Sequence, residues 1–170
     1  MRAEQLVGTV GAVQVKATGA SLLERSRQVP PWRLDAVLAT VFVLTALITT
    51  SRDEPRYEPR DGVAIALLLA ATVPYYVRRL APVPVFVVSM TAVAALYVQD
   101  YDAGGLPFVV AAGAYTVAAY RPLREVALAS ACMYAAFVVM LLSDNPGFGG
   151  PEFATSVPLF AGAMLVGWTL

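Results

Sequence analysis

Six long apolar segments, separated by short polar breaks, are the feature that most restricts how this chain can fold. They cover residues 34–50, 62–77, 82–98, 106–120, 126–142 and 153–170. None has Asp, Glu, Lys or Arg at its centre, where one such residue would cost about 2.5–3.5 kcal/mol in a bilayer. About 20 helical residues cross the hydrocarbon layer, and flanking Tyr, Trp and Arg extend shorter segments into the interface. The segments predict an all-α membrane protein, a six-span transmembrane helix bundle.

Composition supports this fold class and excludes others. Hydrophobic residues make up 58% of the 170 residues and charged residues 14%, whereas a soluble domain has roughly 45–50% and about 25%. Buried strands would need alternation and Gly/Asn turns, which the segments lack. Twelve basic and twelve acidic residues cancel, so no general attraction to nucleic acid is expected.

The charges in the breaks predict the orientation of the bundle. One set of breaks is rich in arginine: Arg25, Arg27 and Arg33, then Arg78 and Arg79, then Arg121 and Arg124. The other set carries Asp100, Asp102, Asp144 and Glu152, together with a mixed segment at 51–61. Because basic residues accumulate in cytoplasmic loops, both termini are expected in the cytoplasm. We therefore expect a multi-pass protein of the plasma membrane.

The chain divides into two parts. Residues 1–30 are predicted to form a cytoplasmic N-terminal arm, either poorly ordered or an interfacial helix, and residues 31–170 the six-helix transmembrane domain. The last segment ends without the basic residues that usually follow a cytoplasmic helix end. We therefore expect the chain to be a piece of a longer protein.

Catalytic constellations fail for lack of the residues they need. The chain has no histidine and one cysteine, Cys132, which excludes Ser-His-Asp, Cys-His and HExxH arrangements. No phosphate-binding glycine motif is present, and the segment 147–150 is interpreted as a turn. The carboxylate pairs at 53–54 and 100–102 are interpreted as solvated loop residues. We expect no catalytic residue, cofactor site or metal site in this chain.

Asp35 is the acidic residue nearest to a span. It is interpreted as a charge at a helix start that complements the helix dipole and pairs with Arg33 or a loop arginine. The uncharged polar residues inside the segments are expected to bond carbonyls of their own or a neighbouring helix rather than to line a ligand cavity. They are Thr45, Thr72, Ser89, Thr91, Tyr115, Thr116, Ser130 and Tyr134.

Some further residues carry structural expectations. Trp32 and Trp168 are expected to anchor at the membrane surface, and Cys132 to be a buried apolar side chain. Pro74 and Pro158 are expected to kink their helices. Small residues at spacing four, namely Ala127, Ala131 and Ala135 beside Ser130, predict either a close helix contact or simply an alanine-rich helix.

Four short segments resemble one family of signalling proteins. They are 32–38, with Asp35; 77–85, VRRLAPVPV; 114–122, AYTVAAYRP; and 166–170, VGWTL. In order and spacing they resemble the first-span start, the RRxxP step after the second span, the LYTVAxxRP motif of the fourth span and the W-x-L-G motif before the basic linker. This pattern belongs to actinobacterial sensor histidine kinases that pair with LuxR-type response regulators.

The resemblance implies a membrane-embedded input module for a cytoplasmic kinase that is absent from this chain. Such kinases form homodimers, use ATP and Mg to phosphorylate a histidine, and transfer the phosphate to a response regulator. This chain lacks the histidine and the ATP-binding boxes, so the chain itself is expected to have no kinase activity. Two alternatives stay open: a small six-span transporter or channel subunit, and a membrane scaffold.

Overall fold

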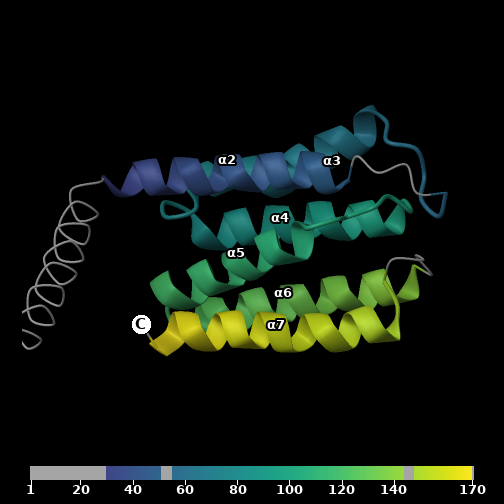
Figure 1. Ribbon diagram of the computed structural model, residues 1–170. Coiled ribbons are helices and arrows are strands. Elements are labelled where there is room, and N and C mark those ends of the chain that lie inside the picture. The colour runs from purple at the N-terminus through teal and green to yellow at the C-terminus, as the bar shows by residue number, and fades with distance from the viewer. Residues whose placement is uncertain (1–29, 51–54, 144–147, 170) are drawn as a thin grey trace, which may run out of the picture. The chain divides into compact units, whose positions relative to one another are not determined.

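A computed structural model describes residues 30–50, 55–143 and 148–169, and this part of the chain is helical without strands (Figure 1). The helices are α2 (Pro31–Thr49), α3 (Gly62–Thr72), the 3-10 helix η1 (Val73–Val77), α4 (Pro82–Val98), α5 (Leu106–Tyr120), α6 (Leu123–Leu142) and α7 (Gly150–Thr169). The all-α prediction is confirmed. The predicted arm at 1–30 lies outside the described residues except for Pro30.

Two of these helices, Trp32–Thr49 and Leu123–Leu142, are long and apolar enough to cross a membrane. The others are shorter apolar helices, at Gly62–Val77, Pro82–Val98, Leu106–Tyr120 and Phe153–Thr169. Each of the six predicted segments is thus helical, while the number of spans stays a prediction.

Helix limits differ from the sequence prediction where proline intervenes. Pro74 has no N–H to continue the α-helical ladder, and the backbone tightens into η1 from Val73. Pro158, in contrast, lies inside a continuous α7. Helix α6 begins at Leu123, directly after Pro122, and therefore three residues before the predicted start.

The chain divides into two units, Met1–Leu34 and Asp35–Leu170. In the second unit α4 is central and packs on α3, α5 and α6, while the most extensive helix pair is α5 with α7. Pro107 and Val110 of α5 lie with Ser156 and Phe160 of α7. Because the C-terminal ends of these two helices also meet, at Tyr115 and Gly167, α5 and α7 run parallel.

Aromatic side chains fill the two halves of this unit. Tyr75 is fully buried, its hydroxyl donates to the carbonyl oxygen of Val109 at 2.6 Å, and its ring meets Phe42 edge-on at 5.1 Å. In the other half, Phe137 contacts Phe148, Phe153 and Phe160 at 5.2 to 5.9 Å between ring centroids. Phe148 belongs to the glycine-rich segment interpreted as a turn, so that segment also contributes a buried core residue.

The packing of α2 inverts the pattern of a water-soluble helix. Its exposed face carries the large side chains of Val37, Val41, Leu44 and Ile48, whereas its buried positions are Asp35, Ala39 and Ala46, with Phe42 half-buried against the core. Water would favour burial of the large apolar side chains instead.

The structure decides between the two interpretations of the small residues and corrects the one for Cys132. Ala127, Ala131 and Ala135 are exposed, so within this unit they make no close helix contact, and the alanine-rich interpretation holds. Cys132 is half-buried rather than buried. The three alanines and Cys132 all lie on α6. This helix packs mainly on α4 and only slightly on α7, so many of its side chains stay uncovered.

Candidate functional site

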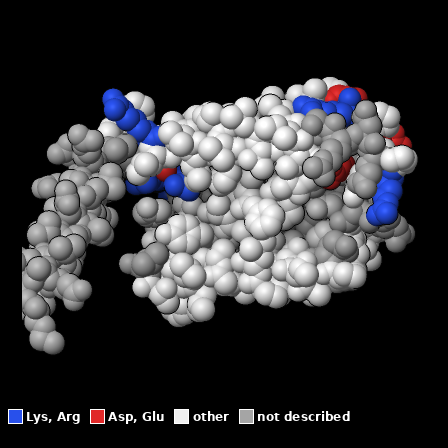
Figure 2. All heavy atoms as spheres, in the orientation of Figure 1, with Lys and Arg blue, Asp and Glu red and all other residues white. Residues whose placement is uncertain are grey.

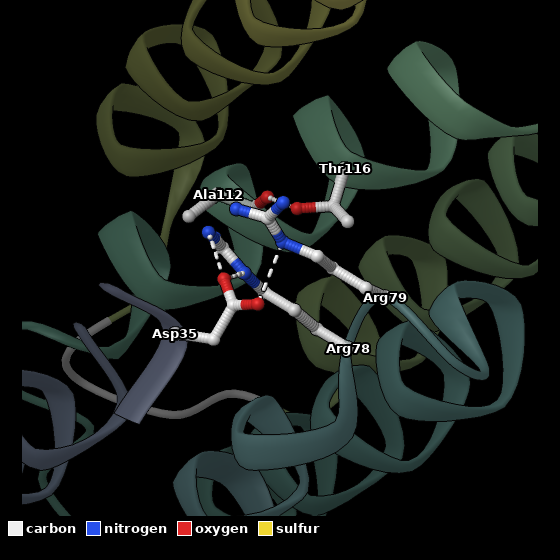
Figure 3. Close-up of polar contacts among 5 residues, drawn as sticks. All are labelled: Asp35, Arg78, Arg79, Ala112 and Thr116. Carbon is white, nitrogen blue, oxygen red and sulfur yellow. Dashed lines mark hydrogen bonds and ion pairs between the residues drawn. The ribbon is translucent and has the colours of Figure 1, made fainter. Parts of the chain in front are cut away.

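The candidate site is a charged cluster of Asp35, Arg78 and Arg79 (Figure 3). The Nε and Nη2 atoms of Arg78 lie 3.0 and 2.8 Å from Oδ1 of Asp35. The Nε of Arg79 lies 2.6 Å from Oδ2 of the same carboxylate. Asp35 is 4% exposed and is the one buried charged residue in the described part of the chain. Two guanidinium groups on one carboxylate leave the cluster with a surplus positive charge.

Local structure places the three side chains together. Asp35 lies on the buried face of α2, and Arg78 and Arg79 follow η1, where the backbone turns toward α4 through Leu80 and Ala81. Removing a carboxylate from water is costly unless it is paired and hydrogen-bonded, and both oxygens of Asp35 have a charged donor. The sequence interpretation of Asp35 as a partner of a loop arginine is confirmed, with two arginines instead of one. Its interpretation as a charge that complements the dipole at a helix start is wrong, because α2 begins at Pro31 and its first turn holds no acidic residue.

The cluster faces the end of α5. Figure 3 shows the Arg79 guanidinium directed toward the turn of α5 that carries Ala112 and Thr116. The Thr116 hydroxyl donates to the Ala112 carbonyl oxygen at 2.7 Å, so it is satisfied within its own helix. The Arg79 guanidinium thus lies on the side of the cluster that faces α5.

The same stretch of α5 touches α7 at Gly167. A Cβ built on Gly167 would lie 2.5 Å from the carbonyl oxygen of Tyr115 and 3.0 Å from the Cβ of Ala118. Distances this short require a residue without a side chain. Gly167 thus lets the backbones of α5 and α7 meet near their C-terminal ends.

Beside this contact lies a cavity of about 240 Å³ between α5, α6 and α7. Its lining includes Ala118, Val126, Ala161 and Met164, with Arg121 and Trp168 as its charged and aromatic members. The Nε of Arg121 pairs with a carboxylate oxygen of Glu125 at 3.5 Å, and both side chains are partly exposed. Sequence reasoning missed this cavity, because its lining residues come from three helices and share no spacing.

The other expected residues do not form a site. The hydroxyls of Thr72 and Ser130 donate to Leu68 and Val126 of their own helices, and Ser89 of α4 donates to Ala71 of α3. These bonds match the expected structural role. Tyr134 is exposed, as are Trp32 and Trp168.

The pair at 100–102 makes local contacts, one through the Asp102 carboxylate and one through the backbone of Asp100. A carboxylate oxygen of Asp102 accepts from the N–H of Gly104 at 2.8 Å, and the Asp100 carbonyl accepts from the N–H of Glu58 at 3.0 Å. Asp53 and Glu54 lie outside the described residues. Among the described residues no group of three or more Cys, Asp or Glu side chains is arranged to hold a metal.

Comparison with known families gives one match. The family described as Domain of unknown function (DUF7134) matches residues 22–170. The chain belongs to this family. The DUF7134 match covers every described helix and all four segments of the signalling resemblance. No curated protein and no solved structure matches the chain.

Proposed function

We propose that this DUF7134 domain is a six-span membrane input module, with both termini in the cytoplasm, for a sensor histidine kinase. The observation that carries the proposal is a convergence of four segments far apart in the sequence. Asp35 binds Arg78 and Arg79, Arg79 is directed toward Thr116, and Gly167 packs on Tyr115. These residues come from the four segments that resemble the kinase family, and a cytoplasmic kinase would follow this end of α7.

The surface of the second unit supports a lipid environment. Large apolar side chains are exposed on every one of its α helices, far more than the isolated patches of a soluble monomer. On the face in Figure 2, charged atoms gather at the two ends and the surface between them is uncharged. This distribution is what an apolar layer between two aqueous phases requires.

Helix lengths are compatible with six spans. Helices α4 and α5 have 17 and 15 residues, or about 26 and 23 Å at 1.5 Å per residue, against a core of roughly 30 Å. Tyr97 lies in the last turn of α4 and Tyr120 ends α5. Aromatic and arginine side chains at such ends extend a short helix into the interface.

The charges at the two ends support the orientation. The end near the cluster carries Arg78, Arg79, Arg121 and Arg124, with Asp35 and Glu125 as its acids. At the other end Asp100 and Asp102 lie between α4 and α5, and before α3 two arginines, Arg56 and Arg60, are balanced by Glu58 and Asp61. The positive-inside rule places the arginine-rich end in the cytoplasm.

Signalling would then follow the contacts of α5. A stimulus that changes helix packing would shift the Asp35–Arg79 cluster and the Gly167 contact, and α7 would carry the shift to the kinase. This requires two packings of similar free energy that the stimulus binds unequally. In the full protein we expect a homodimer that uses ATP and Mg in its kinase domain and passes phosphate to a response regulator.

Cysteine labelling tests the topology. Glu58 and Arg124 are both exposed in the structure, and each is replaced by a single cysteine in a Cys132→Ala background. A membrane-impermeant maleimide added to intact cells should label Glu58→Cys and leave Arg124→Cys unlabelled until the membrane is permeabilised. Labelling of both positions in intact cells contradicts the proposed topology.

A chimera tests the signalling role. Residues 1–170 are joined to the cytoplasmic core of a sensor histidine kinase, and autophosphorylation is measured in membrane vesicles. Gly167→Ala, which disturbs the α5–α7 contact, should change the kinase activity at least severalfold, whereas Gly162→Ala should not. Equal activity of both variants with the parent chimera would refute coupling through this contact. Thr72, Ser89, Thr116 and Ser130 donate to nearby carbonyl oxygens, so these four residues give no support to the transporter alternative.

A further inference from the structure

The cavity between α5, α6 and α7 is an open groove beside Gly167, and its shape and chemistry suit one lipid chain. Its walls are apolar, and its volume is about 240 Å³, below the roughly 300–1,000 Å³ that encloses a drug-sized ligand. Leu165 and Trp168, on its α7 side, are 61% and 72% exposed, so the groove opens toward the surroundings of the bundle. A narrow apolar chain fits these walls better than a bulky ligand.

The positive charge of Arg121 at the groove favours a lipid with an anionic head group. Arg121 is the one charged residue among those lining the groove. Its pair with Glu125 is 3.5 Å long, and both side chains are more than a third exposed, so water screens the pair and a phosphate can replace it. Basic pockets between helices at a cytoplasmic surface are suited to anionic head groups.

We propose that this groove binds an anionic phospholipid of the cytoplasmic leaflet, with one acyl chain between α6 and α7 and its phosphate on Arg121. The proposal rests on the proposed function for the orientation of the groove. It also names a ligand for the input module, because the chain would lie beside Gly167 and Trp168, where α7 leaves the bundle. Occupancy would then bias the packing of α7 on α5.

The two tryptophans of the chain make the groove directly observable. In a Trp32→Phe variant of the full chain, Trp168 is the sole tryptophan. This variant is reconstituted in two sets of phosphatidylcholine vesicles. One set contains a small fraction of phosphatidylglycerol with brominated acyl chains, and the other contains the same fraction of phosphatidylcholine with brominated acyl chains. Bromine atoms close to tryptophan quench its fluorescence. We expect stronger quenching by brominated phosphatidylglycerol.

Matched variants separate the groove from general surface charge. Arg121→Gln should lower the apparent preference for phosphatidylglycerol by about fivefold. Arg124→Gln removes the same charge from an exposed neighbour that does not line the groove and should keep the preference. Ala161→Phe, which fills the groove while retaining Arg121, should abolish it.

Several results would overturn the proposal. Equal quenching by the two lipids means that the groove selects no anion. An equal loss in the Arg121 and Arg124 variants means that surface charge alone attracts the lipid. Weak quenching by both lipids, with a dimer seen by cross-linking through α7, means that a second copy covers the groove. Reversal by inorganic phosphate means that the site binds phosphate without the chain.

The lipid proposal and the proposed function fail separately. Loss of lipid preference in a protein that keeps the labelling pattern of Glu58→Cys and Arg124→Cys refutes only the lipid site. A retained preference with no change of kinase activity in the Gly167→Ala chimera refutes only the signalling role.

Discussion

Gly167 of α7 and Tyr115 of α5 meet so closely that no side chain fits between them. A Cβ at position 167 would lie 2.5 Å from the Tyr115 carbonyl oxygen, and Gly167 is buried. Gly162, five residues earlier on the same helix, has no atom within 4 Å of the corresponding position. The two positions hold the same residue in the same helix, one closely packed and one in open space. Substitution of Gly162 is therefore a matched control for substitution of Gly167.

Gly167→Ala should destabilise the protein, because the α5 backbone must move to admit the methyl group. The expected cost is about 1–3 kcal/mol, typical of overpacking. Gly162→Ala should be neutral or stabilise by up to about 1 kcal/mol through helix propensity. Thermal unfolding of the full chain in detergent, followed by circular dichroism, measures both. Equal midpoints for the two variants would show that α5 and α7 do not pack in this way.

Asp35→Ala should be more damaging than Arg79→Ala. Removing Asp35 leaves the Arg78 and Arg79 guanidinium groups without their carboxylate, and Arg78 is only 16% exposed. Loss of one partner from a buried pair costs about 3–5 kcal/mol. Removing Arg79, which is 36% exposed, leaves Asp35 still paired with Arg78 and should cost less.

The double variant provides the control for this cluster. If Asp35 acts mainly by neutralising the arginines, Asp35→Ala combined with Arg78→Ala should restore part of the unfolding temperature lost in Asp35→Ala. Additive losses in the double variant would mean that the carboxylate acts independently of Arg78.

Tyr75→Phe and Tyr76→Phe compare adjacent hydroxyls in different environments. The Tyr75 hydroxyl is buried and donates to Val109 at 2.6 Å, whereas the Tyr76 hydroxyl shares an exposed bond of 2.8 Å with Thr40. Losing the buried bond should cost about 1 kcal/mol, and losing the exposed one less, because the Thr40 hydroxyl keeps its bond to the carbonyl oxygen of Ala36. A larger loss for Tyr76→Phe in thermal unfolding would contradict the burial of Tyr75.

Helix positions could be predicted from the sequence more readily than helix contacts. The limits of α4 and α5 match the apolar segments, because Pro82 and the Leu106–Pro107 step start them and polar residues end them. The change from α3 to η1 at Val73 was signalled by Pro74. The early start of α6 was not, because Arg124 and Glu125 are charged residues typical of a loop, although both lie in the first turn of this helix.

Of the candidate site, only the pairing of Asp35 with an arginine could be predicted from the sequence. The position of Asp35 at a helix start indicated a paired carboxylate, but its two partners lie more than 40 residues away, and no spacing rule connects them. The role of Gly167 and the groove beside Arg121 depend on the parallel contact of α5 and α7. That contact cannot be inferred from chain order, since α6, and not α5, precedes α7.

Acid should weaken the start of α3 through Asp61. A carboxylate oxygen of Asp61 accepts from the N–H groups of Ala64 and Val63, each at 2.9 Å. The bond from Ala64, followed by bonds from the Tyr101 hydroxyl and Val63, holds the pKa of Asp61 below its usual value of 3.8, against desolvation that acts the other way. Because the folded pKa is depressed, this stabilisation is present above pH 3.8 and is lost as the pH falls through the folded value.

Asp61→Asn isolates this effect, since asparagine also caps a helix but does not titrate in this range. The unfolding temperature of the natural chain should exceed that of Asp61→Asn at neutral pH, and the difference should shrink when the pH falls below 3.8. Tyr101→Phe removes a bond to the carboxylate and should move the loss to higher pH. A difference between the natural chain and Asp61→Asn that stays constant with pH would show that the ionised carboxylate does not stabilise the start of α3.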